Sequence, residues 1–152
     1  MGRILSTLVA AAVLTCLSAC SDEPIADKVT GTYKCNTFET TQYQKNGKWR
    51  DTTYVYNNDG KVVITRVDDN TVDISLKSQR CGEGSATGVR LTDMNYMANL
   101  SGNGSFTLSS TNFSYDSKIS GSINYENKGM SLSAILQGVS PRHNITFNNI
   151  QR

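Results

Sequence analysis

The chain has 152 residues, 38% of them hydrophobic, and a formal net charge of +2 at pH 7. Once a leader is removed, this length suits one domain with a real core and is too short for two. The basic residues are scattered, whereas nucleic-acid binding needs a stripe or patch of them, so no nucleic-acid partner is expected.

Residues 1–19 have the pattern of a lipoprotein signal peptide. Arg3 precedes an apolar run over residues 8–17, which is shorter than the about 20 residues that a membrane-spanning helix needs. Residues 17–20 then read Leu-Ser-Ala-Cys, so small residues lead into a cysteine as they do in a lipobox. We predict cleavage before Cys20 and lipid on its thiol, which would anchor the chain to a membrane. An ordinary cleavable signal is the alternative.

Residues 20–28 are predicted to form a lipidated tether, because they are short, polar and mildly acidic. Ser21 stands where an aspartate would favour retention in the inner membrane. The Cys-Ser-Asp-Glu start is similar to the export signals of surface-displayed lipoproteins of Bacteroidetes. We therefore expect a place in the bacterial outer membrane, on its periplasmic or its cell-surface face.

Residues 29–152 are predicted to form one all-β domain. Short alternating runs rich in Thr, Val, Ile and Tyr are separated by turn-forming Asn-Gly, Asp-Gly and Ser-Gly pairs, which is typical of antiparallel strands. Asn46 and Gly47 suit a tight hairpin turn between residues 39–45 and 49–56, and another turn is expected at residues 57–60.

Two later hairpins have the clearest alternation. Residues 62–67 and 71–77 flank Asp68-Asp69-Asn70, and residues 118–127 and 130–137 flank a second turn. Residues 78–88 are expected to form a loop, a turn is expected at residues 101–104, and residues 144–150 are the last strand. Sequential hairpins either close into an up-and-down barrel or leave exposed edges, and closure is favoured at about eight strands.

Two cysteines remain in the mature chain when Cys16 is removed and Cys20 is lipidated. In an oxidising compartment, Cys35 and Cys81 can form a single pair. Such a disulfide would contribute roughly 4 kcal/mol in the chain-entropy model. A structural disulfide between Cys35 and Cys81 is therefore predicted, rather than a metal or redox site.

The chain resembles the calycin-like (lipocalin-like) β-barrel lipoproteins of Bacteroidetes. The resemblance rests on the Gly-Thr-Tyr opening at residues 31–33, the hairpins over residues 62–76 and 119–136, and the last strand, Asn-Ile-Thr-Phe-Asn. It implies an eight-stranded calycin barrel, in a family whose members mostly lack an assigned activity. Lipocalins proper have a tryptophan where this chain has Tyr33, and an arginine from the far end packs over it; Arg142 and Arg152 are the candidates for that arginine.

Aromatic residues crowd one predicted hairpin and are the candidate ligand-binding residues: Trp49, Tyr54 and Tyr56. Strict alternation puts the two tyrosines on one face and Trp49 on the other. Aromatic side chains could bind a sugar or a partner at the barrel mouth. They could equally be ordinary strand and core residues, because tyrosine is common in strands.

No residue pattern predicts catalysis, a metal or a cofactor. His143 lacks a recognisable nucleophile and orienting carboxylate, and a solvated loop histidine is the expectation. The Asp68-Asp69-Asn70 run lacks the glycine and closing glutamate of a calcium loop and is expected to form a hairpin turn. Glu83 is a lone carboxylate. We expect no enzyme activity, no catalytic residue and no cofactor.

The sequence thus favours a membrane-anchored, extracytoplasmic lipoprotein whose β-barrel binds a small apolar or glycan ligand. The alternative is a structural or interaction subunit of an envelope complex, with a barrel filled by side chains and no ligand. A barrel interior with a cavity of about 300 Å³ or more would favour the first function.

Overall fold

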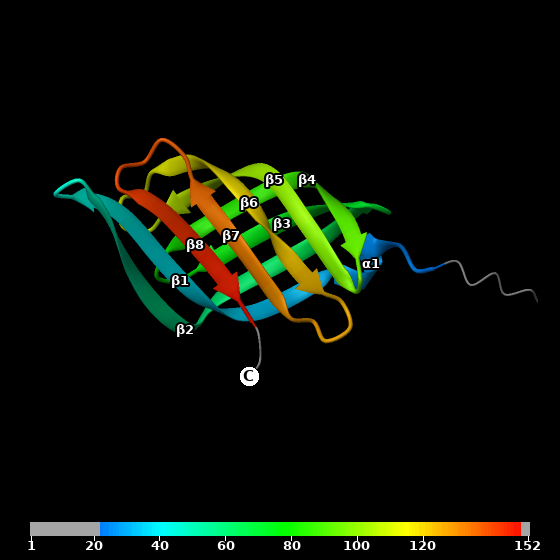
Figure 1. Cartoon of the computed structure of the whole chain (residues 1–152). Helices are drawn as coiled ribbons and strands as arrows, with labels where there is room; N and C mark the ends of the chain where they lie inside the picture. The colour runs from blue at the N-terminus through cyan, green and yellow to red at the C-terminus, as the bar shows by residue number, and fades with distance from the viewer. Residues whose placement is uncertain (1–21, 150–152) are drawn as a thin grey trace, which may run out of the picture.

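The computed structural model describes residues 22–149, in which eight strands form one closed antiparallel barrel (Figure 1). Every strand pairs with the next along the chain, and the last pairs with the first. This confirms the predicted all-β, up-and-down barrel. In chain order the elements are α1 (Ile25–Val29), β1 (Gly31–Lys45), β2 (Lys48–Asp68), β3 (Thr71–Ser78), β4 (Gly82–Met94), β5 (Met97–Leu108), β6 (Ser114–Asn124), β7 (Met130–Leu136) and β8 (Arg142–Asn148).

The turn predicted at residues 57–60 is a bulge within β2. The register of β1 and β2 shifts between Cys35 and Thr37, so β2 carries extra residues there and continues. Asn58 has a φ of 53°, and its amide donates a hydrogen bond to the side-chain oxygen of Asn36. An Asx-rich segment of this kind can bend a strand without ending it.

Two other segments that were predicted to be a loop or a turn also belong to strands. Residues 82–88, expected to belong to a loop, form the first half of β4, and residues 101–104, expected to turn, lie inside β5. Both segments lie in the β4–β5 ladder: Gly82 opposes Leu108, Ser101 opposes Arg90, and the two segments meet where Ala86 opposes Gly104. Glycine- and serine-rich composition signals a turn locally, but hydrogen bonding to long neighbours keeps these segments extended.

The barrel interior is filled by apolar side chains. The predicted inward faces of β3 and β7 are buried, including Val72, Ile74 and Leu76. Phe106 and Phe147 are both fully buried, with ring centroids 6.4 Å apart. Burying side chains of this size contributes about 1.5–3 kcal/mol each, so a filled interior stabilises the barrel at the expense of room for a ligand.

Helix α1 covers one end of the barrel (Figure 1). It buries Ile25, Ala26 and Val29. The Ala26 amide donates a hydrogen bond to the carbonyl of Asp69, at 3.2 Å. The buried Tyr33 hydroxyl donates to the Val29 carbonyl at 2.6 Å. The predicted tether over residues 20–28 is therefore shortened: from Ile25 onward it packs on the barrel, because apolar residues in this segment close the barrel end.

Cys20 and the signal peptide lie outside the described residues, as does Arg152. Among residues 22–149, no helix has the length and apolar character needed to cross a bilayer.

The predicted disulfide between Cys35 and Cys81 is absent. Within the described residues both cysteines are buried free thiols. Burial raises the pKa of Cys35 to about 12, and the negative charge of Asp59 adds to this effect. Burial likewise raises the pKa of Cys81 to about 11. Each thiol is therefore held protonated inside the barrel, which makes it a poor nucleophile.

We expect Cys35 and Cys81 of the folded protein to resist iodoacetamide at pH 8, since both are buried and protonated. In denaturant without any reductant, both should become alkylated. Peptide mapping by mass spectrometry scores each cysteine separately. Failure of denatured, unreduced protein to take up the label at these positions would mean that a disulfide joins them.

Candidate functional site

Strands β1 and β2 extend beyond the end of β8, the strand that closes the barrel. β8 pairs with β1 as far as Gln42, which opposes Arg142. Beyond this point, residues 43–51 form a two-stranded arm, in which the described partners of β1 and β2 are each other. The arm ends in the predicted tight turn, where Asn46 and Gly47 have φ values of 53° and 71°. Figure 1 shows the arm projecting at the end of the barrel opposite α1.

The candidate ligand residues lie on two faces of this hairpin, as alternation predicts. Tyr56 opposes the fully buried Thr37 and packs against the core, so its face looks toward the barrel. Tyr54 shares that face but is 54% exposed. Trp49 opposes Gln44 and belongs to the other face. The structure therefore does not bring Trp49, Tyr54 and Tyr56 into one cluster.

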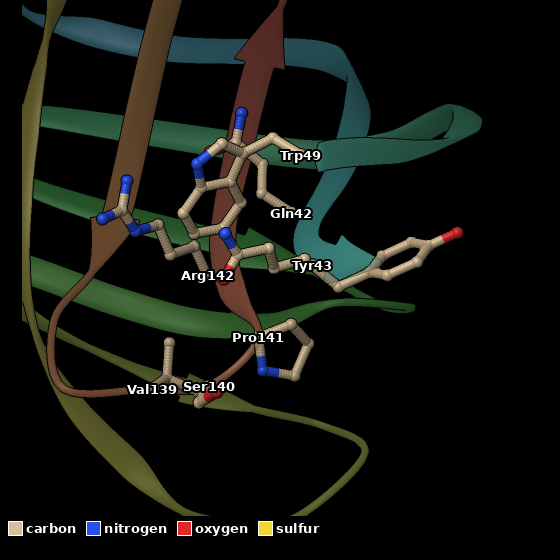
Figure 2. Close-up of a pocket in the computed structure, with 8 residues that line it drawn as sticks. Gln42, Tyr43, Trp49, Val139, Ser140, Pro141 and Arg142 are labelled. Atoms are coloured by element: carbon tan, nitrogen blue, oxygen red, sulfur yellow. The ribbon is translucent and has the colours of Figure 1, made fainter. Parts of the chain in front are cut away.

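Trp49 instead lines an open pocket of about 510 Å³ on the outside of the barrel. Its walls come from the arm and from the loop between β7 and β8: Gln42, Tyr43, Gln44, Trp49, Val139, Ser140, Pro141 and Arg142. In Figure 2 the Arg142 guanidinium lies beside the Trp49 ring, while the Tyr43 ring extends away from that pair.

The contact between Arg142 and Trp49 organises this pocket. The guanidinium carbon of Arg142 is 4.8 Å from the centroid of the Trp49 ring, within the range of a cation–π interaction. An exposed pair of this kind contributes about 0.5–1 kcal/mol. Because β8 is fixed to β1 by the barrel, Arg142 orients an indole that would otherwise be free on the arm. Arg142 was a candidate to pack over Tyr33, at the position of the lipocalin tryptophan; it packs on Trp49 instead.

The pocket combines one aromatic platform with polar side chains. Trp49 is 54% exposed, so much of its indole remains open to a ligand. Gln42 and Gln44 offer both donors and acceptors, and Arg142 offers only donors. An apolar ring face beside several directional polar groups suits a saccharide, whose rings have an apolar face and a rim of hydroxyls.

A second, more buried group lies on the barrel face of the same strands. Glu39 lies 3.5 Å from Nε2 of His143, and the Tyr56 hydroxyl donates a hydrogen bond to Glu39 at 3.3 Å. Partial burial and then the negative charge of Glu39 raise the pKa of Tyr56. His143 was expected to be a solvated loop histidine; it is half-buried at the start of β8, where it joins β8 to β1.

The contacts of this buried group join β8 to β1. Nδ1 of His143 lies 3.2 Å from the Pro141 carbonyl, and its Nε2 faces Glu39. Both ring nitrogens are therefore engaged. A nucleophile needs an adjacent base or a lowered pKa, whereas the pKa of Cys81 and of Tyr56 is raised.

Asp68 forms the turn that its sequence predicts. Its carboxylate accepts a hydrogen bond from the Asn70 amide at 2.9 Å, which lowers the pKa of Asp68. The neighbouring Asp69 carboxylate pairs with Arg66 at 2.5 Å, and Arg66 also lies 3.4 Å from Asp27 of α1. These acidic residues hold the β2–β3 turn and the helix together.

The two glutamines, and the contact of Arg142 with Trp49, are features of the site that sequence reasoning missed. Arg142 is distant from Trp49 in the chain and meets it only because β8 closes on β1. Alternation could have placed Gln42, Gln44 and Trp49 on one face, since the hairpin register follows from the Asn46–Gly47 turn.

Comparisons with known proteins identify a similar fold. No protein-family model matches the chain, and no curated protein matches it in sequence. Among solved structures, it is similar to a crystal structure from Bacteroides fragilis of a protein provisionally described as an outer membrane protein, with a TM-score of 0.64 and 21% identity. The match covers 85% of this chain and 53% of that one, so this chain spans about half that protein's length. At this identity, the similarity shows the barrel fold.

Proposed function

We propose that the protein is a lipid-anchored outer-membrane lipoprotein, without enzymatic activity, that binds a saccharide at the Trp49 pocket. The observation that carries this proposal is the exposed indole of Trp49, held by Arg142 and flanked by Gln42 and Gln44. The lipobox at Cys20 supports the anchor. The fold shared with a provisional outer membrane protein of Bacteroides fragilis, together with the sequence resemblance to calycin-like lipoproteins, supports the location.

A saccharide suits the site better than the small apolar ligand that was the other expectation. An apolar ligand of a lipocalin-like barrel would lie inside it, and the interior here is occupied by side chains such as Phe106 and Phe147. The Trp49 pocket is open to water and lined largely by polar groups. Directional hydrogen bonds to hydroxyls, combined with stacking on one ring, fit this surface.

The second candidate function is an interaction subunit of an envelope complex. The filled interior favours it, because nothing in the barrel core then needs a ligand. The projecting arm favours it too, since exposed tryptophan and arginine are the residues that dominate protein interfaces. In this case the same Trp49 and Arg142 would contact a protein.

Replacing Trp49 with Ala should weaken saccharide binding by about 30-fold, the equivalent of about 2 kcal/mol for an aromatic anchor. The assay is retention on an array of bacterial surface saccharides. Val55→Ala is the matched control, because Val55 has nearly the same exposure, 52% against 54%, on the same face of β2. Both variants should remain folded; loss of the Arg142 contact, about 0.5–1 kcal/mol, lowers the unfolding temperature of Trp49→Ala by no more than a few degrees.

Unchanged retention of the Trp49→Ala variant would count against the saccharide site. The other informative result is that the parent protein binds no saccharide on the array but crosslinks to an envelope protein, and loses that crosslink when Trp49 is replaced. That result would favour the interaction function over the saccharide site.

The lipid anchor is tested independently in cells. Globomycin, which blocks the lipoprotein signal peptidase, should make the uncleaved precursor accumulate if Cys20 is lipidated. Immunoblotting of whole cells separates the precursor from the mature chain. Normal maturation in the presence of globomycin would show that an ordinary signal peptidase acts and that Cys20 carries no lipid.

A further inference from the structure

An exposed group of side chains lies at the end of the barrel that α1 covers. Met94 ends β4 and Tyr96 lies in the β4–β5 turn, and they are 60% and 56% exposed. The Tyr96 ring meets the Tyr125 ring edge-on, with centroids 6.0 Å apart, and the Lys28 ammonium of α1 lies 5.0 Å from the Tyr125 centroid. We call Met94, Tyr96, Tyr125 and Lys28 the anchor-side rim.

The rim is tied firmly to the helix that follows Cys20. Lys128 donates a hydrogen bond to the carbonyl of Lys28 at 2.5 Å, which joins the β6–β7 turn to α1. The Tyr125 amide donates to the Tyr96 carbonyl at 3.1 Å, and its hydroxyl donates to Asp93 at 2.9 Å. Tyr96 is therefore held in place next to α1, and the exposed Met94 lies two residues before it at the end of β4.

The backbone at Tyr96 shows that the fold does not favour this residue there. Asn95 and Tyr96 have φ values of 51° and 66°, close to the 53° and 71° of Asn46 and Gly47 in the arm. Both turns need a left-handed residue at the second position, where glycine is free of steric cost and tyrosine is not. Tyr96 keeps this conformation while its ring contacts Tyr125 and stays 56% exposed, so the side chain is placed for a further contact outside the barrel.

The length of chain between Cys20 and α1 indicates the surface that this contact would meet. Five residue steps separate Cys20 from Ile25, and an extended chain spans at most about 3.6 Å per residue, or roughly 18 Å in all. A lipid on Cys20 therefore holds α1, and the rim beside it, close to the membrane surface. The tip of the arm lies at the other end of β1, a strand of 15 residues, or about 50 Å at 3.3 Å per residue.

We propose that the anchor-side rim rests on the lipid bilayer, with Met94 and Tyr96 in its interfacial layer, and that the Trp49 pocket faces away from the membrane. This inference rests on the lipid anchor proposed above. Tyrosine is favoured at the membrane–water interface because its ring is apolar and its hydroxyl is polar. Acidic groups (Asp27, Asp69, Asp93 and Glu126) are mixed with basic ones (Lys28, Arg66 and Lys128) at this end, so the contact suits a zwitterionic surface.

The single tryptophan of the chain makes the orientation measurable. The full-length, acylated protein is reconstituted into phosphatidylcholine vesicles whose acyl chains carry bromine, a short-range quencher of tryptophan fluorescence. In the parent protein the fluorescence comes from Trp49, and in the double variant Trp49→Phe, Tyr96→Trp it comes from the rim. The two positions are almost equally exposed, 54% and 56%, so a difference reports their distance from lipid.

Tryptophan at position 96 should lose most of its fluorescence in brominated vesicles compared with unbrominated ones, and Trp49 should lose none. Trp49→Phe, Met94→Trp provides a second rim probe in case position 96 does not tolerate the larger ring. Acylated, vesicle-bound protein whose rim probes are both unquenched would overturn the rim contact and leave the anchor intact. Mass spectrometry showing no acyl chains on Cys20 would overturn the anchor and, with it, the rim.

Discussion

Pairing of β1 with β8 is the constraint on which the rest of this structure depends. Without it, the eight strands would form an open sheet with two exposed edges, each a template for aggregation. The pairing uses only Asn36 to Gln42 of β1, the middle of a strand that runs from Gly31 to Lys45. The two ends of β1 that do not pair with β8 differ in their contacts: the N-terminal end contacts α1, and the C-terminal end forms the arm with β2.

Closure also explains where function can be located. An eight-stranded barrel has an interior just wide enough to be filled by side chains or to hold one small ligand. Here Phe106, Phe147 and their aliphatic neighbours fill it. The proposed binding of a ligand or a membrane is thereby placed at the two ends, and the ends differ: one is covered by α1 and carries Met94 and Tyr96, and the other carries Trp49 and Arg142. Because only a short chain joins Cys20 to α1, a lipid on Cys20 would place the α1 end at the membrane and the Trp49 end in solvent.

The sequence predicts the fold well because one period dominates it. Alternation along residues 71–77 and 130–137 identifies the inward faces, and tight turns such as Asn46–Gly47 fix the hairpin registers. Asx- and glycine-rich segments mislead where a long partner strand keeps them extended, as at Asn58. The helix at residues 25–29 was missed because five residues are too few to show a helical period.

The site was only partly predictable, because it depends on contacts that are distant in the chain. Trp49 is conspicuous as the one tryptophan, but its partner Arg142 follows from closure and not from any local pattern. Tyr54 and Tyr56 are near Trp49 in sequence and on the opposite face in space. The two mature cysteines suggest a disulfide by count and compartment, whereas pairing depends on geometry that sequence does not supply.

Hydrogen–deuterium exchange along β1 tests closure most directly. If β8 closes the barrel, backbone amides of residues 36–42 should exchange only through global unfolding, as slowly as the core strands β3 and β7. Residues 43–45, in the arm, should exchange much faster under the same conditions. Equally fast exchange over residues 36–45 would mean that β1 is an open edge and that the barrel is not closed.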